Sequence, residues 1–170
     1  MAKLIFVKTR ETPSDRIVNT FFNDLGTLMK IRGFQLIKHF TPQGEIAKLD
    51  WYSFAQKAVL CSLNPLTTQP PISQQVKTQW DKISDELSIF QLVDVFLFDE
   101  LGLIEESITP LKQQLITIFS SRISAIAIVH RDRVRNISYL TNRFDLKFIE
   151  ANENNVENMY SRLIRELYDR

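Results

Sequence analysis

Polar side chains of types that bind anions or transfer protons follow several of the short apolar runs in this sequence. In an open parallel sheet, ligands bind beyond the carboxyl ends of the strands, so these positions are the first to inspect. The run 93–98 ends in the acidic pair Asp99 and Glu100, which is suited to acid–base chemistry or to holding a cation. The candidate ligand-binding residues chosen on this basis are Thr9, Arg10, Ser62, Asp99, His130 and Arg131.

Charge is unevenly distributed along the chain. Residues 81–106 carry eight acidic side chains against one lysine, whereas residues 122–143 carry five arginines against one aspartate. Arginine favours planar recognition of phosphate or carboxylate, so the segment 130–133 is a candidate nucleotide contact. If the two segments face each other they form surface ion pairs, which are worth little each. If they do not, they present an acidic and a basic face to a protein partner or to a second copy of the chain.

The composition excludes several classes of function. The formal net charge is +1, which gives no signal of a nucleic-acid-coating protein. The four glycines are too scattered for a P-loop or a dinucleotide fingerprint. Cys61 is the single cysteine, so neither a disulfide nor a CxxC site can form, and the two histidines are too few for an all-protein zinc site. We therefore expect no metal site and no cofactor.

Hydropathy predicts no contact with a membrane. The apolar run 4–7 is far too short for a signal peptide, and no stretch approaches the roughly 18 apolar residues of a membrane span. The expected location is the cytoplasm.

The elements that must position the candidate residues alternate regularly along the 170 residues. Alternation of strand and helix predicts parallel strands joined by right-handed crossovers, with helices on both faces. We expect one domain over residues 1–170, an α/β fold in a three-layer α/β/α sandwich with a mostly parallel sheet of five or six strands. Strands are predicted at 4–7, 34–37, 58–61, 93–98, 124–129 and 146–149. Helices are predicted from Thr12 to Ile31 with Gly33 as the stop, at 46–55, from Ser73, from Thr109, after His130, and from Val156.

Part of the sequence, roughly residues 3–129, resembles TIR domains, which share a flavodoxin-like layout. The strand 34–37 and the Pro/Gly-containing turn 41–46 are similar to the second strand and following loop of that family. The strand 58–62, with its terminal serine, is similar to the third strand, and the next helix carries Trp80 and Glu86. The resemblance implies that Glu86 is the catalytic residue, engaging the nicotinamide ribose of NAD while the glycosidic bond breaks.

Two functions from different classes remain open at this point. The first is a signalling or protein-interaction module without an evident catalytic constellation, with a nucleotide as a further ligand. The alternative is a TIR-like, nucleotide-directed enzyme that cleaves NAD with Glu86 as the key carboxylate.

Overall fold

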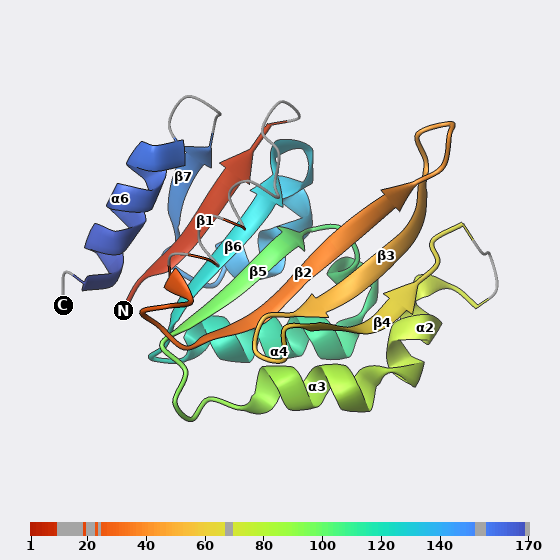
Figure 1. Cartoon of the computed structure of the whole chain (residues 1–170), viewed down its shortest axis with the longest axis horizontal. Coiled ribbons are helices and arrows are strands. Elements are labelled where there is room, and N and C mark those ends of the chain that lie inside the picture. The colour runs from red at the N-terminus through yellow and green to blue at the C-terminus, as the bar shows by residue number, and fades with distance from the viewer. Residues whose placement is uncertain (10–18, 20–22, 24, 67–69, 152–155, 169–170) are drawn as a thin grey trace.

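The structure is a computed structural model, and it describes residues 1–9, 19, 23, 25–66, 70–151 and 156–168. Within these ranges the chain forms a single seven-stranded sheet and helices that pack on it (Figure 1). The strands are β1 (Lys3–Lys8), β2 (Ile31–Phe40), β3 (Ile46–Ser53), β4 (Ala58–Leu63), β5 (Val95–Leu101), β6 (Ser124–His130) and β7 (Lys147–Ala151). The helices are α2 (Ile72–Thr78), α3 (Trp80–Ser88), α4 (Thr109–Ser120), α5 (Ser138–Thr141), α6 (Val156–Tyr168) and the 3₁₀ helices η1 (Glu105–Ser107) and η2 (Arg131–Ile137).

The sheet has a parallel part and an antiparallel part, in the order β4-β3-β2-β5-β6-β1-β7. Neighbours from β2 to β7 pair parallel, whereas β2, β3 and β4 form an antiparallel meander. The predicted α/β class and mostly parallel sheet are confirmed, but the predicted number of five or six strands is wrong. The parallel strands bring the ends of β1, β2, β5 and β6 to one edge of the sheet.

The additional strand is β3, where the sequence predicted a helix over 46–55. Leu49 and Trp51 alternate with a period of two and are fully buried on the same face, where Trp51 pairs with Leu36 of β2. The apolar positions Ile46, Leu49 and Phe54 also fit a helical stripe, and a short run of this kind does not distinguish the two patterns. The pairing of β3 with β2 on one side and with β4 on the other selects the strand.

Hydrophobic cores lie on both faces of the sheet. One core joins the sheet to α2, α3, α4, η2 and α5, through side chains such as Phe98 of β5 and Phe119 of α4. The other core includes Phe6 of β1 and Leu167 of α6. Figure 1 shows α3 and α4 along one face and α6 beside β7. The parallel strands are therefore covered on both sides, as their continuous apolar sequences predict.

Gly33 is not the stop of a helix, as predicted, but a residue inside β2. Its φ is +122°, and a Cβ at this position would lie 1.9 Å from the carbonyl oxygen of Leu97 on β5. The absence of a side chain lets the two backbones approach. Most of the predicted first helix, including its start at Thr12, falls outside the described residues, while Ile31, predicted as its end, begins β2.

Candidate functional site

The end of β5 departs from regular strand geometry at the acidic pair. The register between β5 and β6 shifts between Phe98 and Leu101, and Glu100 adopts a φ of 63°. In a regular strand, neighbouring side chains point to opposite faces. A bulge re-aims a side chain, and a non-glycine residue at positive φ stores backbone strain of the kind found at functional sites. Here both carboxylates are buried, Asp99 at 1% and Glu100 at 0% exposure.

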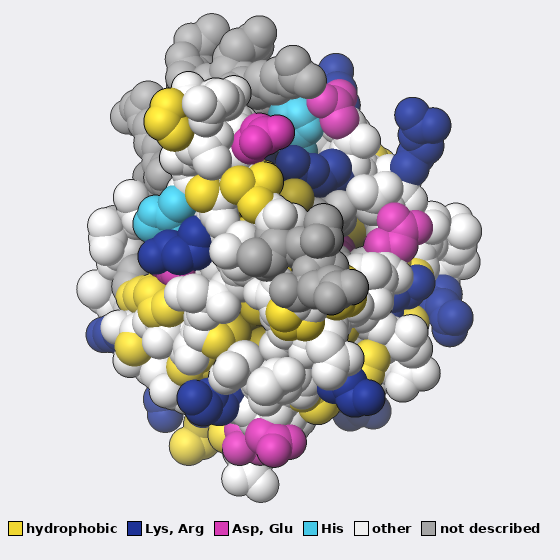
Figure 2. All heavy atoms as spheres, turned by 90° about the vertical axis from the view of Figure 1, so that its right-hand side faces the viewer, with side chains coloured by type: hydrophobic (Ala, Val, Ile, Leu, Met, Phe, Trp, Pro, Cys, Tyr) yellow, Lys and Arg dark blue, Asp and Glu magenta, His cyan; other side chains and the backbone are white. Residues whose placement is uncertain are grey.

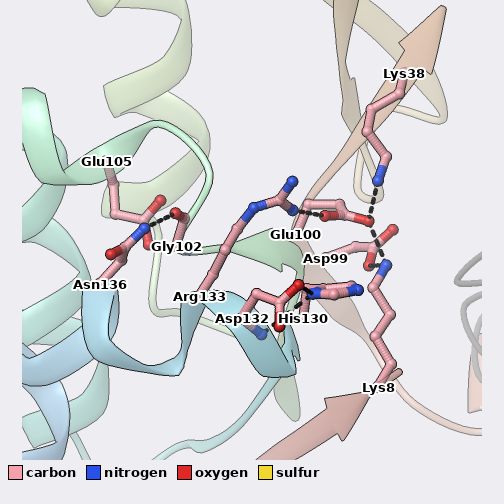
Figure 3. A network of polar contacts seen from close by, with 10 residues as sticks. All are labelled: Lys8, Lys38, Asp99, Glu100, Gly102, Glu105, His130, Asp132, Arg133 and Asn136. Carbon is pink, nitrogen blue, oxygen red and sulfur yellow. Dashed lines mark hydrogen bonds and ion pairs between the residues drawn. The ribbon is translucent and has the colours of Figure 1, made fainter. Parts of the chain in front are cut away.

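Three cationic side chains from three different elements converge on Glu100 (Figure 3). Lys8 of β1 and Lys38 of β2 both contact Oε1, and the Lys38 distance is 2.8 Å. Arg133 of η2 reaches Oε2 at 2.9 Å. Lys8 Nζ also lies 4.0 Å from Asp99 Oδ1. We call these five residues the acid–cation cluster.

The two carboxyls of the cluster differ in protonation. Burial raises the pKa of Asp99 to about 7, and the nearby Lys8 ammonium only partly opposes this shift. Burial alone would also raise the pKa of Glu100, but its ion pairs with Lys8 and Lys38 outweigh burial and lower it to about 2. Asp99 Oδ1 is buried without a hydrogen-bond partner among the described residues. The cluster thus contains one ionised carboxylate and one carboxyl that titrates near neutral pH.

A short polar network holds η2 beside the turn that follows β5. Asn136 donates a hydrogen bond to the carbonyl oxygen of Gly102 at 2.8 Å. A Cβ on Gly102 would lie 2.9 Å from the carbonyl oxygen of Arg133, so the turn and η2 are in close contact. The buried Glu105 accepts hydrogen bonds from the Gly102 N–H and, at 3.1 Å, from the Tyr139 hydroxyl. This packing places Arg133 over Glu100.

His130, at the end of β6, belongs to the same edge. It pairs in register with Lys8, and Figure 3 shows its ring extended toward Asp99 and Lys8. Its Nδ1 accepts a hydrogen bond from the Asp132 N–H at 3.2 Å. Burial lowers the pKa of His130; the Asp132 carboxylate opposes this shift, while Arg133 and Lys8 add to it. The imidazole is therefore neutral at physiological pH.

Thr9 and Arg131, also predicted as ligand-binding residues, are not among the five residues of the acid–cation cluster. Thr9 follows β1 directly and is half-buried, while Arg10 lies outside the described residues. Arg131 is more than half exposed and pairs at 2.6 Å with Glu150, itself largely exposed. Such a surface pair contributes little to stability. Arg133, two residues later, is the arginine that reaches the acidic pair.

Ser62 belongs to a second cluster, on the antiparallel part of the sheet. Its hydroxyl donates to Asp50 Oδ1 at 2.6 Å, and Asp50 Oδ2 lies 2.8 Å from His39 Nε2. Burial would raise the pKa of Asp50, but these hydrogen bonds and the charge of Lys48 hold it below its usual value. Because Asp50 stands between Ser62 and His39, the imidazole does not contact the hydroxyl as a catalytic base must.

Glu86 lies away from the acid–cation cluster. It is buried on α3, where Arg32 of β2 lies 3.6 Å from Oε2 and Gln56 donates to the same oxygen at 3.3 Å. Arg32 pairs in register with Phe96, near the start of β5. Glu86 is therefore near the amino edge of the parallel strands, whereas Asp99 and His130 meet at the carboxyl edge.

The opposite charges of the two charged segments meet inside the molecule at one point. Glu100 of the acidic segment pairs with Arg133 of the arginine segment, and this contact is buried on the carboxylate side. From the sequence, any ion pairs between the two segments were expected at the surface, whereas the structure shows a buried ion pair. Figure 2, which faces the β4 side of the sheet, shows acidic and basic side chains interspersed over this surface.

The candidate ligand-binding residues chosen from the sequence included neither Lys8 nor Lys38, and Arg133 entered only as part of the candidate segment 130–133. A buried carboxylate pair requires cations, and the lysine immediately after the apolar run 4–7 was a usable signal of one. Nothing local marks Lys38, because its contact depends on the position of β2 beside β5. Among the described residues, no group of three or more His, Cys, Asp or Glu side chains is arranged to hold a metal ion. The described part of the chain also contains no helix long and apolar enough to cross a membrane.

Comparison with models of protein families and with curated protein sequences finds no match to this chain. Among solved structures, the fold is similar to the solution structure of a human cancer-related nucleoside triphosphatase. The TM-score is 0.70, the sequences are 12% identical, and the match covers 99% of this chain and 98% of the other. At this identity the likeness shows a shared fold.

This finding corrects both functional expectations from the sequence. The fold is shared with a nucleoside triphosphatase, which overturns the expectation of a non-catalytic signalling or interaction module. It also gives no support to an NAD-cleaving, TIR-like enzyme, and Glu86 is buried beneath Arg32 and Gln56.

Proposed function

We propose that this protein binds a nucleoside triphosphate at the carboxyl edge of its parallel strands and hydrolyses the terminal phosphate. The observation that carries the proposal is the acid–cation cluster at the ends of β1, β2 and β5. The fold shared with a nucleoside triphosphatase agrees with it.

The charges of the cluster suit a polyphosphate. Three side-chain cations surround two carboxylates, and one of these carboxyls has a pKa near neutrality. The site therefore carries a net positive charge. Lys38 and Arg133 have 22% and 27% of their side chains exposed, so they are the members that an incoming phosphate meets first. Arginine adds planar, bidentate recognition of phosphate oxygens.

Asp99 has the properties of a proton acceptor for the attacking water. A general base works best when its pKa is close to the working pH, and the pKa of Asp99 is raised to about 7. In the proposed reaction, the water oxygen forms a bond to the terminal phosphorus. The bond from that phosphorus to the bridging oxygen breaks, and the water proton passes to Asp99. The products are a nucleoside diphosphate and inorganic phosphate.

Magnesium commonly accompanies nucleoside triphosphates, held by one or two carboxylates and by phosphate oxygens at about 2.0–2.1 Å. The acid–cation cluster does not fit this ion. Glu100 already holds Lys8, Lys38 and Arg133. An ion bound to Asp99 Oδ1 would lie within about 6 Å of the Lys8 ammonium, where repulsion is on the order of 5 kcal/mol at an effective dielectric constant of about 20.

The proposal is tested by phosphate release from ATP, GTP, CTP and UTP by the purified protein and by Asp99→Asn. Asparagine resembles the protonated form of Asp99 in shape, so the variant should fold like the parent. We expect its turnover to fall by about 10²- to 10⁴-fold, the usual contribution of a general base. Asp85→Asn, at an exposed position of α3, is the matched control and should retain activity. Equal turnover by the parent and by Asp99→Asn would refute the role of Asp99.

A further inference from the structure

We infer that this site binds its triphosphate without a divalent cation, because Lys8, Lys38 and Arg133 occupy the place and perform the charge neutralisation that a bound metal would otherwise provide. This inference rests on the proposed function and concerns the form in which the substrate is bound, namely the metal-free polyanion.

The first observation is how completely Glu100 is engaged. Lys8 and Lys38 share Oε1, while Arg133 contacts Oε2, so each oxygen already has a cationic partner. Glu100 itself is fully buried. A metal ion could coordinate Glu100 only after at least one of these contacts was broken. The metal would thus have to displace the ammonium of Lys8 or Lys38, or the guanidinium of Arg133, from Glu100.

The second observation concerns Asp99 and the fixed position of Lys8. Asp99 Oδ1 lacks a hydrogen-bond partner among the described residues, and Lys8 Nζ is 4.0 Å away from it. The Lys8 side chain is only 4% exposed, so its ammonium cannot retreat into solvent to make room for a second cation. The free oxygen of Asp99 thus faces an ammonium, and it remains available to a neutral donor such as water.

The third observation is that the side chains of the other two cations are partly exposed to solvent. Lys38 and Arg133 are each more than a fifth exposed at the side chain, and Figure 3 shows them approaching Glu100 from different directions. Either can redirect a donor from Glu100 to a phosphate oxygen while Lys8 continues to neutralise the buried carboxylate. Polyphosphate binding then exchanges one anionic partner for another.

The sequence lacks the phosphate-binding loop that P-loop nucleoside triphosphatases use. In P-loop nucleoside triphosphatases, a glycine-rich loop and its lysine cradle the phosphates, and a loop Ser or Thr helps to hold Mg²⁺. The pattern G-x-x-x-x-G-K-[ST] does not occur in this sequence. Without a glycine-rich cradle, the phosphates are left to side chains, such as those of the cluster, and to helix N-termini at the strand ends.

The test is calorimetric titration of the full chain with ATP, once with excess MgCl₂ and once with excess EDTA, at matched ionic strength because screening alters such contacts. We expect ATP to bind in EDTA at least as tightly as in magnesium, with a dissociation constant in EDTA no more than about threefold larger than that in magnesium. Inorganic tripolyphosphate in EDTA serves as a probe without base or ribose and should also bind.

Two variants connect the result to the cluster. Lys8→Met removes the buried ammonium and leaves the carboxylates open to a metal, so ATP binding should become at least about tenfold tighter in magnesium than in EDTA. Arg133→Met, at a partly exposed position, tests the same cluster without altering a fully buried side chain and should weaken binding in EDTA. Lys48→Met, which changes a half-exposed lysine near Asp50, should behave like the parent in both conditions.

The outcomes distinguish the inference from the proposed function. Binding in EDTA that is equal to or tighter than binding in magnesium, together with metal dependence gained in Lys8→Met, supports the inference. Binding by the parent protein only in magnesium overturns the inference and leaves the proposed function in place. Absence of ATP binding in both conditions overturns the proposed function itself.

Discussion

Lys8 and Glu100 form a buried ion pair that connects two strands that are not neighbours in the sheet. Lys8 ends β1 and Glu100 lies near the end of β5, and β6 runs between these strands. The contact spans β6 at the carboxyl edge, where His130 ends β6 beside Lys8. One ion pair thus fixes the relative positions of the residues assigned to the candidate site.

Removing the charge of Glu100 should destabilise the fold. In Glu100→Gln, the Lys8 ammonium remains buried without its ionised partner, and breaking a buried pair in this way costs about 3–5 kcal/mol. Urea denaturation at neutral pH measures the free energy of unfolding. Glu150→Gln, which removes an exposed partner of Arg131, is the control and should cost no more than about 1 kcal/mol. Similar losses in the two variants would contradict the assignment of a buried pair.

Gly33 should tolerate no side chain. In Gly33→Ala, the new Cβ would lie 1.9 Å from the Leu97 carbonyl oxygen, so β2 and β5 must separate at this position. We expect a loss of about 1–3 kcal/mol from overpacking, in addition to the strain of the positive φ. Gly44→Ala is a matched control, because Gly44 also has a positive φ, +83°, but has open space around it. Thermal unfolding of both variants should show the larger loss in Gly33→Ala.

The raised pKa of Asp99 predicts how stability depends on pH. The folded state holds this proton more tightly than the unfolded state does, so the contribution of Asp99 to stability is complete below pH 3.8 and is lost as pH rises through about 7. Asp99→Asn removes this dependence. The unfolding free energy of the variant relative to the parent should therefore increase between pH 4.5 and 7.5, by about 3 kcal/mol. A difference that is constant over this range would show that the pKa of Asp99 is not raised.

Hydrolysis should follow the same titration. Asp99 accepts a proton only when ionised, so turnover is expected to rise with pH through an apparent pKa of about 7. The measurement is the initial rate of phosphate release from pH 5.5 to 8.5 at constant ionic strength. Any residual rate of Asp99→Asn should lack this dependence, and an unchanged profile in the variant would assign the titration to another group.

The partly exposed cations should contribute to triphosphate binding, unlike Arg131. Lys38→Met and Arg133→Met each remove a charge-assisted contact, and we expect weaker binding by about tenfold or more. Arg131→Met should bind normally, because Arg131 pairs with Glu150 on the surface. Equilibrium dialysis with labelled ATP compares the three variants. Loss of binding in Arg131→Met alone would instead assign the phosphate contact to Arg131, a ligand-binding arginine predicted from the sequence.

The sequence predicted the parallel part of the fold well, for a physical reason. The central segments of β1, β5 and β6, residues 4–7, 95–98 and 125–129, are continuously apolar, as expected of strands that are covered on both faces. The meander of β3 and β4 was harder to predict. The segment 46–53 reads equally well at helical spacing, and its strand conformation depends on antiparallel pairing with β2 and β4, which the apolar spacing of the segment itself does not show.

The candidate site was predictable only in part. The rule that ligands gather at the carboxyl ends of parallel strands singled out Asp99 and His130, which the structure places at one edge. It did not single out Lys38, whose contact with Glu100 requires β2 to lie beside β5. It also favoured Arg131 over Arg133, because the choice depends on how η2 packs against the Gly102 turn.

The central claim, that a triphosphate binds at the carboxyl edge of the parallel strands, is tested most directly by a nuclear magnetic resonance titration of isotope-labelled protein with ATP. We predict saturable shifts of the backbone amide signals of Lys8, Glu100, His130 and Arg133. A separate cleft of about 710 Å³, lined by Lys30, Arg32 and Lys57, lies at the amino edge near Glu86. Shifts confined to that cleft, with no change at the four carboxyl-edge amides, would contradict the account.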